Sequence, residues 1–268
     1  MKKYICLSLL MIVLVGCSPL QKAMKSEDVA YKREVAQQLY DQKKYRKALR
    51  LYEQLERVGR GTPDAEMMFF NFANSSYFVK DYMLARERYK LFAAAYPKSA
   101  HHEEALLLEI KSTFALSPVY SLDQGFTHAT ITKLQEFIDT YPASEYAIEA
   151  NQIMTKANQK LEKKTFENAK QLNTIGGWTR DYTAAIIALD NFIFDYPGTI
   201  YKEDALYYKF DSAYNLAINS VYSKMEDRLE NAKTMYEALI RFKEDTKYRN
   251  QADRMLERVN NDLQQFSK

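Results

Sequence analysis

A short pattern recurs three times along the chain, at matching offsets. The copies run from Phe92 to Ala105, from Phe137 to Ala150 and from Phe192 to Ala205. In each copy a proline stands five residues after the phenylalanine, and the alanine stands eight residues after the proline. A fourth copy has lost its proline but keeps Leu239 and Ala252 thirteen residues apart. Self-similarity of this kind predicts a repeat protein in which neighbouring units share one core.

The residues of each copy predict how its helices begin and end. A tyrosine precedes each proline, and the Tyr-Pro pair is expected to end a helix because proline lacks an amide hydrogen. Ser99, Ser144 and Thr199 follow and are placed to cap the next helix. A small residue, a larger one and an apolar one, spaced four and three apart, lie on one helical face. These stripes are Ala48-Tyr52-Leu55, Ala85-Tyr89-Phe92, Thr130-Leu134-Phe137 and Ala185-Leu189-Phe192.

The stripes and prolines resemble the markers of the tetratricopeptide repeat. They predict an all-α fold, a superhelical array of about five tetratricopeptide-like helix pairs with a C-terminal closing helix that reaches Phe266. We expect an N-terminal half over residues 27–143 and a C-terminal half over residues 144–268. The second half should begin with a long helix from Glu145 to Asn173, ended by Gly176-Gly177-Trp178. The helix pairs are expected at 27–60, 64–98, 100–143, 144–198 and 199–244.

The N-terminus has the pattern of a bacterial lipoprotein signal. Lys2 and Lys3 precede an apolar run that is too short to cross a membrane, which takes about 20 apolar residues. The run ends in Leu14-Val15-Gly16-Cys17, typical of a lipobox. We therefore expect residues 1–16 to be cleaved, Cys17 to carry lipid and residues 17–26 to form a tether. An ordinary secretory signal with an accidental cysteine is the alternative.

Composition and motifs argue against several classes of function. Removal of the signal lowers the formal charge of +3 by two, which leaves no electrostatic case for nucleic-acid binding. His101, His102 and His128 do not have the spacing of metal ligands, and no phosphate loop or nucleophile elbow is present. The sequence therefore predicts a protein that is not an enzyme, with no catalytic residue, metal or cofactor.

Two groups of residues are candidates for binding. Tyr40, Phe70, Asn74, Tyr77 and Phe78 are expected on the inner wall of the superhelix, where aromatic and amide side chains could hold an extended peptide. Packing against the neighbouring unit is the alternative for these five. The segment Lys43-Lys44-Tyr45-Arg46-Lys47 forms a small basic patch. It is either a solvated face or a contact for an acidic partner or lipid.

Three segments carry a resemblance to a known family: the stretch from Phe137 to Ala150, the long helix through Trp178, and Ala184 to Thr199. Together they resemble the BamD (ComL/YfiO) family of outer-membrane assembly lipoproteins. The resemblance covers nearly the whole mature chain. Only Cys17 carries over from it as a functional residue.

The resemblance implies a non-enzymatic scaffold of the β-barrel assembly machine, lipid-anchored at the periplasmic face of the outer membrane. It implies two partners, the periplasmic domains of BamA and unfolded outer-membrane proteins. We expect the first three units to receive the unfolded client, and the last two units with the closing helix to dock BamA. The alternative is another periplasmic repeat lipoprotein, a pilus-assembly pilotin or a peptidoglycan-synthesis organiser. A ligand-uptake lipoprotein would need clustered tryptophans, and Trp178 is the only one.

Overall fold

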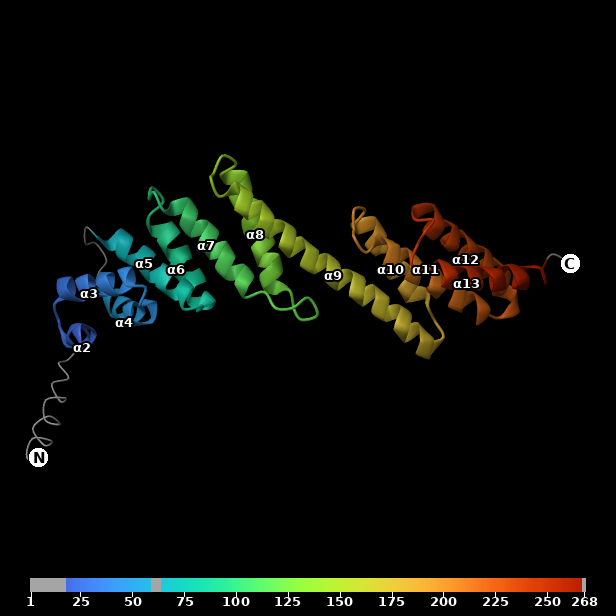
Figure 1. The fold of residues 1–268 in the computed structure, drawn as a ribbon, viewed down its shortest axis with the longest axis horizontal. Coiled ribbons are helices and arrows are strands. Elements are labelled where there is room, and N and C mark those ends of the chain that lie inside the picture. Colours follow the sequence, from blue (N-terminus) through green and yellow to red (C-terminus); the bar gives the residue numbers. More distant parts are fainter. Residues whose placement is uncertain (1–17, 59–63, 267–268) are drawn as a thin grey trace, which may run out of the picture. The chain divides into compact units, whose positions relative to one another are not determined.

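The computed structural model describes residues 18–58 and 64–266, and every regular element in these ranges is an α-helix. The helices follow one another through short turns (Figure 1). Their bounds are α2 (Pro19–Lys25), α3 (Val29–Asp41), α4 (Tyr45–Leu55), α5 (Ala65–Phe78), α6 (Tyr82–Ala95), α7 (His102–Ala115), α8 (Gly125–Thr140), α9 (Ala147–Thr179), α10 (Thr183–Asp195), α11 (Lys202–Ile218), α12 (Tyr222–Phe242) and α13 (Arg249–Leu263).

The helices pack in consecutive pairs. Helix α3 contacts α4, α5 contacts α6, α7 contacts α8 and α11 contacts α12, and α13 packs on α11 and α12. Helix α10 packs on the later part of α9 through a cluster that contains Phe166, Leu189 and Phe192. The predicted fold class, an all-α array of tetratricopeptide-like pairs with a closing helix, is confirmed.

The chain divides into two compact units, residues 1–157 and residues 158–268, and the division falls inside α9. Each unit has three hydrophobic clusters, built from the helices of neighbouring pairs. Those of the first unit include Tyr52, Tyr89 and Leu134, and those of the second include Phe192, Phe210 and Leu229.

The predicted stripes form the centre of these clusters. All twelve residues of the four stripes are buried, and the small residue of each is completely inaccessible to solvent. An alanine or threonine at that position lets the partner helix approach closely, and the larger side chains fill the space beside it. The assignment of the stripes to the core is therefore confirmed.

The fourth copy is more complete than the sequence suggested. Ala232, Tyr236 and Leu239 have the same spacing as the other stripes, and all three are buried in α12. Thr246 lies seven residues after Leu239, as Ser99 lies seven after Phe92, and its Oγ1 accepts a hydrogen bond from the amide of Tyr248 at 3.3 Å. The turn therefore survives the loss of its proline.

The Tyr-Pro pairs end their helices in one common conformation. Tyr96, Tyr141 and Tyr196 are the C-caps of α6, α8 and α10, with φ of −127°, −125° and −124° and ψ of 63°, 56° and 68°. These angles leave the helical region, as the residue before a proline must. The predicted role of the prolines is confirmed.

The capping role predicted for Ser99, Ser144 and Thr199 needs correction. The N-caps of α7 and α11 are His101 and Tyr201, two residues later than predicted. Each hydroxyl oxygen accepts the amide hydrogen two residues ahead, at 3.0, 3.2 and 3.0 Å respectively. Serine and threonine stabilise turns in this way, so these residues shape the turn that leads into the helix.

The predicted end of the long helix at Gly176-Gly177 is wrong, because α9 continues through both glycines to Thr179. Arg180 then turns the chain with a φ of 60°. A Cβ on Gly176 would lie 2.5 Å from the ring of Tyr182, whereas one on Gly177 would lie 3.6 Å from its hydroxyl. The first glycine is therefore required by the close approach of this ring, and neither glycine stops the helix.

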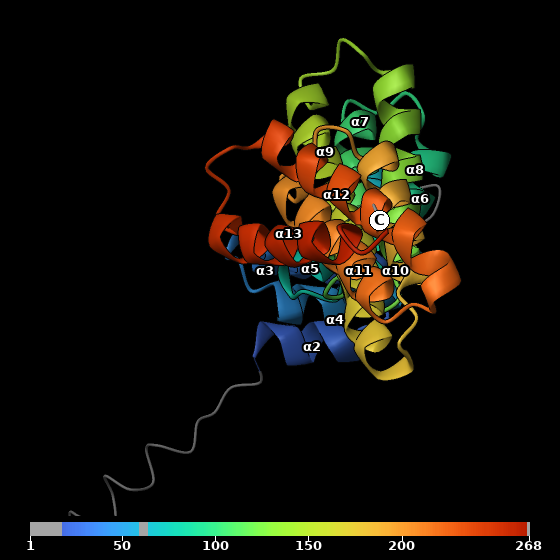
Figure 2. The same ribbon diagram turned by 90° about the vertical axis from the view of Figure 1, so that its right-hand side faces the viewer.

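The segment expected as a tether contains a helix that the sequence analysis missed. Pro19 opens α2, and Ser18 and Gln21 cap it reciprocally. Ala23 is fully buried, and α2 packs on α3 and α4, beside which it lies in both views (Figures 1 and 2). The first described residues therefore belong to the folded body.

We expect Ala185→Glu to destabilise the protein by about 3–5 kcal/mol, because it buries an unpaired carboxylate between two helices. Ala184→Glu is the matched control, since the neighbouring alanine of α10 is exposed and its replacement should cost less than about 0.5 kcal/mol. Urea unfolding followed by circular dichroism measures both. Equal stabilities of the two variants would show that the assignment of Ala185 to the buried face of α10 is wrong.

The two glycines of α9 should respond in opposite directions to the same change. Gly176→Ala should destabilise by about 1–3 kcal/mol, because its methyl group collides with the ring of Tyr182. Gly177→Ala should stabilise by about 0.5–1 kcal/mol, because alanine favours a helix and meets only an ordinary contact. Thermal unfolding of the two variants tests this, and a loss of stability in both would contradict it.

Candidate partner-binding surfaces

Asn74, one of the five predicted binding residues, lies in the interior and joins two tyrosines. Its Nδ2 donates to the hydroxyl of Tyr40 at 3.1 Å, and its Oδ1 accepts from the hydroxyl of Tyr89 at 2.6 Å. The Asn74 side chain is only 8% exposed. Burial raises the pKa of both Tyr40 and Tyr89, so both remain neutral phenols. Asn74 and Tyr40 thus hold α3, α5 and α6 together.

The other three predicted residues differ in their surroundings. Phe70 is only 4% exposed and stacks on His101 with ring centres 4.4 Å apart, so it belongs to the core. Tyr77 is half-buried against Tyr82 and Tyr89. Phe78 is 50% exposed. Of the five, Phe78 and parts of Tyr40 and Tyr77 reach solvent, whereas Phe70 and Asn74 lie inside the first unit.

A groove of about 430 Å³ lies in the first unit, between α4, α5 and α6. Its lining is mostly apolar, and Leu91 is 50% exposed on its wall. The sequence analysis missed this groove, because no local pattern separates Leu91 from any other exposed leucine of a helix. The side chains that line it are Glu56, Phe69, Arg88, Leu91, Phe92, Ala94, Ala95 and Tyr96.

Arg88 is the polar group of this groove. It forms an ion pair with Glu56, and its guanidinium lies 4.6 Å from the ring centre of Phe72. Its Nε is buried and has no hydrogen-bond partner among the described residues. Buried donors are normally paired, so this N–H is an unsatisfied donor in a side chain that lines the groove.

The same place in the next repeat has a different chemistry. Lys133 occupies the position of Arg88, four residues before the stripe phenylalanine, and its Nζ lies 2.7 Å from the buried carboxylate of Glu109. A smaller pocket of about 280 Å³ lies beside this pair. A charged pair therefore lines this smaller pocket, whereas the lining of the groove beside Arg88 is mostly apolar.

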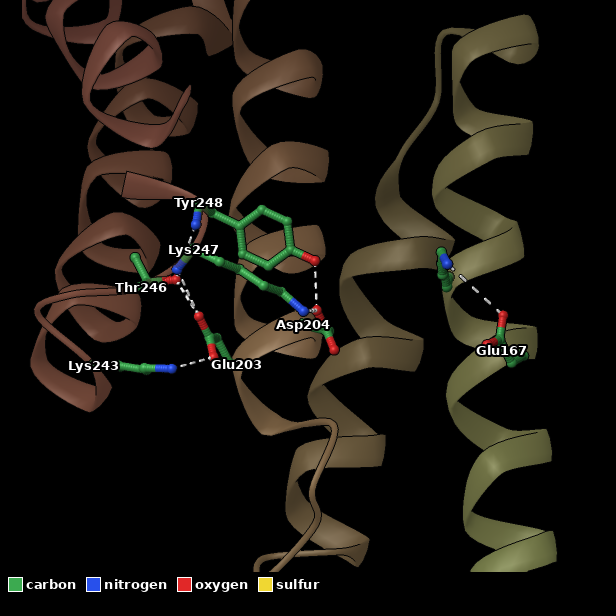
Figure 3. A network of polar contacts seen from close by, with 8 residues as sticks. Glu167, Glu203, Asp204, Lys243, Thr246, Lys247 and Tyr248 are labelled. Carbon is green, nitrogen blue, oxygen red and sulfur yellow. Dashed lines mark hydrogen bonds and ion pairs between the residues drawn. The ribbon is translucent and has the colours of Figure 1, made fainter. Parts of the chain in front are cut away.

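The second unit contains a polar network where α11 begins beside the turn between α12 and α13. The carboxylate of Glu203 accepts from Nζ of Lys243 at 2.9 Å, from Oγ1 of Thr246 at 2.7 Å and from the amide of Lys247 at 2.9 Å (Figure 3). The Lys243 hydrogen bond is the largest influence and, with the other two donors, lowers the pKa of Glu203 to about 2. The carboxylate is thus charged at neutral pH and holds the turn in place.

Asp204 extends the network. It accepts hydrogen bonds from the hydroxyl of Tyr248 and pairs with the ammonium of Lys247. The ring of Tyr248 stacks on Tyr207 at 3.7 Å with an angle of 4° between the planes. Burial raises the pKa of Tyr207 to about 12. Helices α11 and α13 are therefore fixed to each other by charge, hydrogen bonds and stacking.

Exposed apolar side chains flank this network. Phe194, at the end of α10, is 84% exposed, and Ile200, in the turn before α11, is 82% exposed. Phe242, at the end of α12, is also exposed, and Nζ of Lys202 lies 5.3 Å from its ring centre. We call Phe194, Ile200 and Phe242 the apolar turn surface. Large exposed apolar groups on a rigid frame are typical of interaction sites.

In residues 18–58 and 64–266, no three His, Cys, Asp or Glu side chains come together as metal ligands. No helix in these ranges is long and apolar enough to cross a bilayer. Nε2 of His102 lies 3.2 Å from the hydroxyl of Tyr141, so it takes part in packing. Cys17, the predicted lipidation site, lies outside the described residues.

A family model described as YfiO, outer membrane lipoprotein, matches residues 23–173, more than half of the chain. The chain belongs to the YfiO family. The predicted family and the predicted location as an outer membrane lipoprotein are thereby confirmed. The match extends from α2 into α9 and does not include α10 to α13. The place of these later helices in the repeat array comes from the repeat pattern and the fold. No curated protein matches the chain.

The network around Glu203 predicts a pH-dependent contribution to stability. The lowered pKa of Glu203 means that this contribution is complete above its ordinary pKa of 4.5 and is lost as the pH falls towards 2. Glu203→Gln should therefore lower the free energy of unfolding by about 1 kcal/mol at pH 7. This deficit relative to the parent protein should disappear in acid. Glu244→Gln, an exposed glutamate of the same turn, is the control. Urea unfolding between pH 7 and 2 measures the deficit, and a constant deficit would contradict the assignment.

Proposed function

We propose that the protein is a non-enzymatic scaffold of the β-barrel assembly machine, anchored by lipid on Cys17 at the periplasmic face of the outer membrane. It binds the periplasmic domains of BamA and receives unfolded outer-membrane proteins. Membership of the YfiO family and the tetratricopeptide-like fold support this role. The apolar groove that contains Arg88 is the observation that carries it, because it fits an unfolded chain better than a small polar substrate.

The groove suits an extended segment of an unfolded barrel protein. Strands of such barrels alternate apolar and polar side chains. Apolar side chains can contact Phe69, Leu91 and Tyr96, while Nε–H of Arg88 donates to a main-chain carbonyl. Such contacts depend on the apolar character and the main chain of the client and not on its exact sequence, so they tolerate many clients. Tyr77 stays a candidate contact for the client, and Tyr40, Phe70 and Asn74 support these helices from within.

The second unit suits a folded partner domain. The apolar turn surface is presented by turns that Glu203 and Asp204 hold in place through the network. A rigid, partly apolar surface loses little conformational entropy when a folded domain docks on it. We assign BamA to this surface and the client to the groove of the first unit.

Photo-crosslinking in intact cells tests the assignment of the two surfaces. A crosslinker at Leu91 should capture unfolded barrel proteins, and one at Ile200 should capture BamA. Met83 and Ile187 are matched controls, since both are exposed apolar residues outside these two surfaces and should capture little. Capture of the same protein at both positions would contradict the division. Capture of a pilus or peptidoglycan-synthesis protein in place of BamA would overturn the proposed function.

A further inference from the structure

Three basic residues hold a backbone conformation that glycine favours. Lys43, Lys80 and Arg180 have φ of 57°, 65° and 60°. Each lies in the turn between the two helices of a pair, five residues before the small stripe residue of Ala48, Ala85 or Ala185. Side chains other than glycine are strained in this region. Glycine would relieve the strain at each of these positions, but a basic residue occupies all three. We infer that the positive charge at these turns has a function.

Two of these cations lie on one surface of the first unit, in an open hollow of about 490 Å³. We call this surface the basic shelf. It brings together the turn between α3 and α4 and the turn between α5 and α6, and its five cationic side chains are exposed. The residues of the shelf are Lys43, Lys44, Tyr45, Arg46, Lys47, Phe78, Val79 and Lys80.

No ion pair involves the five cations of the shelf within the described residues, and Nζ of Lys44 donates to the side-chain oxygen of Gln42 at 2.8 Å. The two nearest acidic residues in sequence form hydrogen bonds within their own helices. Asp41 accepts from Nε2 of Gln37 at 2.8 Å, and Asp81 caps α6 by accepting from the amide of Leu84 at 3.1 Å. The five cations outnumber these two acidic residues, so the shelf keeps an excess of positive charge.

An aromatic pair lies among these cations. The rings of Tyr45 and Phe78 stack with centres 4.4 Å apart, and Tyr40 packs edge-on against Tyr45 at 5.5 Å. The pair is fixed from the interior, while half of the Phe78 side chain remains in contact with water. Aromatic side chains beside lysine and arginine are typical of surfaces at the boundary between bilayer and water.

Five of the eight shelf residues belong to the helix pair that follows the predicted lipid anchor. Helix α2 begins two residues after Cys17 and packs on α3 and α4, and α4 itself begins at Tyr45 of the shelf. Ala23 of α2 and Ala48 of α4 are buried in the same hydrophobic cluster. A lipid on Cys17 would thus keep the helices of the shelf close to the bilayer.

We propose that the basic shelf binds the headgroups of anionic phospholipids in the leaflet that holds the anchor. The five cations attract the phosphates, and Tyr45 and Phe78 insert at the level of the headgroups. This contact orients the first unit against the membrane, which an attachment at one residue alone does not do. The inference rests on the proposed anchoring at Cys17, but the binding of lipid by the shelf can be measured without the anchor.

Sedimentation with vesicles tests the proposal. The mature chain with Cys17→Ala has no lipid, so any binding to vesicles comes from its surface. It should bind phosphatidylcholine vesicles that contain phosphatidylglycerol, bind poorly to phosphatidylcholine alone, and dissociate at high salt. Lys44→Gln with Lys47→Gln should weaken binding about tenfold or more, since both lysines contact the headgroups. Phe78→Ser should also weaken binding at low salt, because the ring of Phe78 inserts at the level of the headgroups.

The matched control replaces the same number of charges elsewhere on the first unit. Lys90→Gln with Lys98→Gln should change binding by less than about twofold, because both lysines are exposed outside the shelf. Melting curves equal to those of the parent show that the variants fold. Equal binding to neutral vesicles, or equal weakening by both double variants, would overturn the proposal. So would a shelf variant that keeps vesicle binding but loses a protein partner, which would assign the shelf to an acidic protein.

Discussion

The structure depends on one packing contact, repeated in five helix pairs. A small residue at the crossing of two helices lets their backbones approach, and a large residue four positions later fills the space that remains. Ala48, Ala85, Thr130, Ala185 and Ala232 occupy the crossing, and all five are fully buried. Because this contact depends on side chains within one helix face, the rest of each helix is free to vary. Grooves, charged turns and exposed apolar residues can therefore differ between repeats without any change of the frame.

Repeat-equivalent positions show how one frame gives different surfaces. Arg88 and Lys133 lie at the same place in successive pairs, and both form ion pairs, but with different partners. Arg88 pairs with Glu56 and stacks on Phe72 of the facing helix, whereas Lys133 pairs with the buried Glu109 of its facing helix. The family resemblance describes the frame, and residues such as these decide what each repeat can bind.

Most features set by neighbours in sequence could be predicted, whereas features set by neighbours in space could not. The exceptions among the local features are the capped start of α2 and the N-caps of α7 and α11. The stripes, the Tyr-Pro ends and the five pairs follow from spacing along the chain. The end of α9 was mispredicted because Gly176 is required by the ring of Tyr182, a contact that no local rule describes. The burial of Phe70 and Asn74 depends on Tyr89 and His101 from other helices. The groove likewise needs side chains from different helices, so no sequence pattern around any one of its residues predicts it.

The hydrogen bonds of Asn74 bear on how the first unit unfolds. Stacked repeats tend to behave as a one-dimensional chain, in which an end repeat can open while its neighbours stay folded. Asn74 opposes this, because its amide joins Tyr40 of the first pair to Tyr89 of the second, through a part-buried and a buried hydrogen bond respectively. Asn71 adds a second link to Gln37 at 2.9 Å. Opening of the first pair would leave polar groups of the second pair without their hydrogen-bond partners. The two pairs should therefore unfold together, as one cooperative unit.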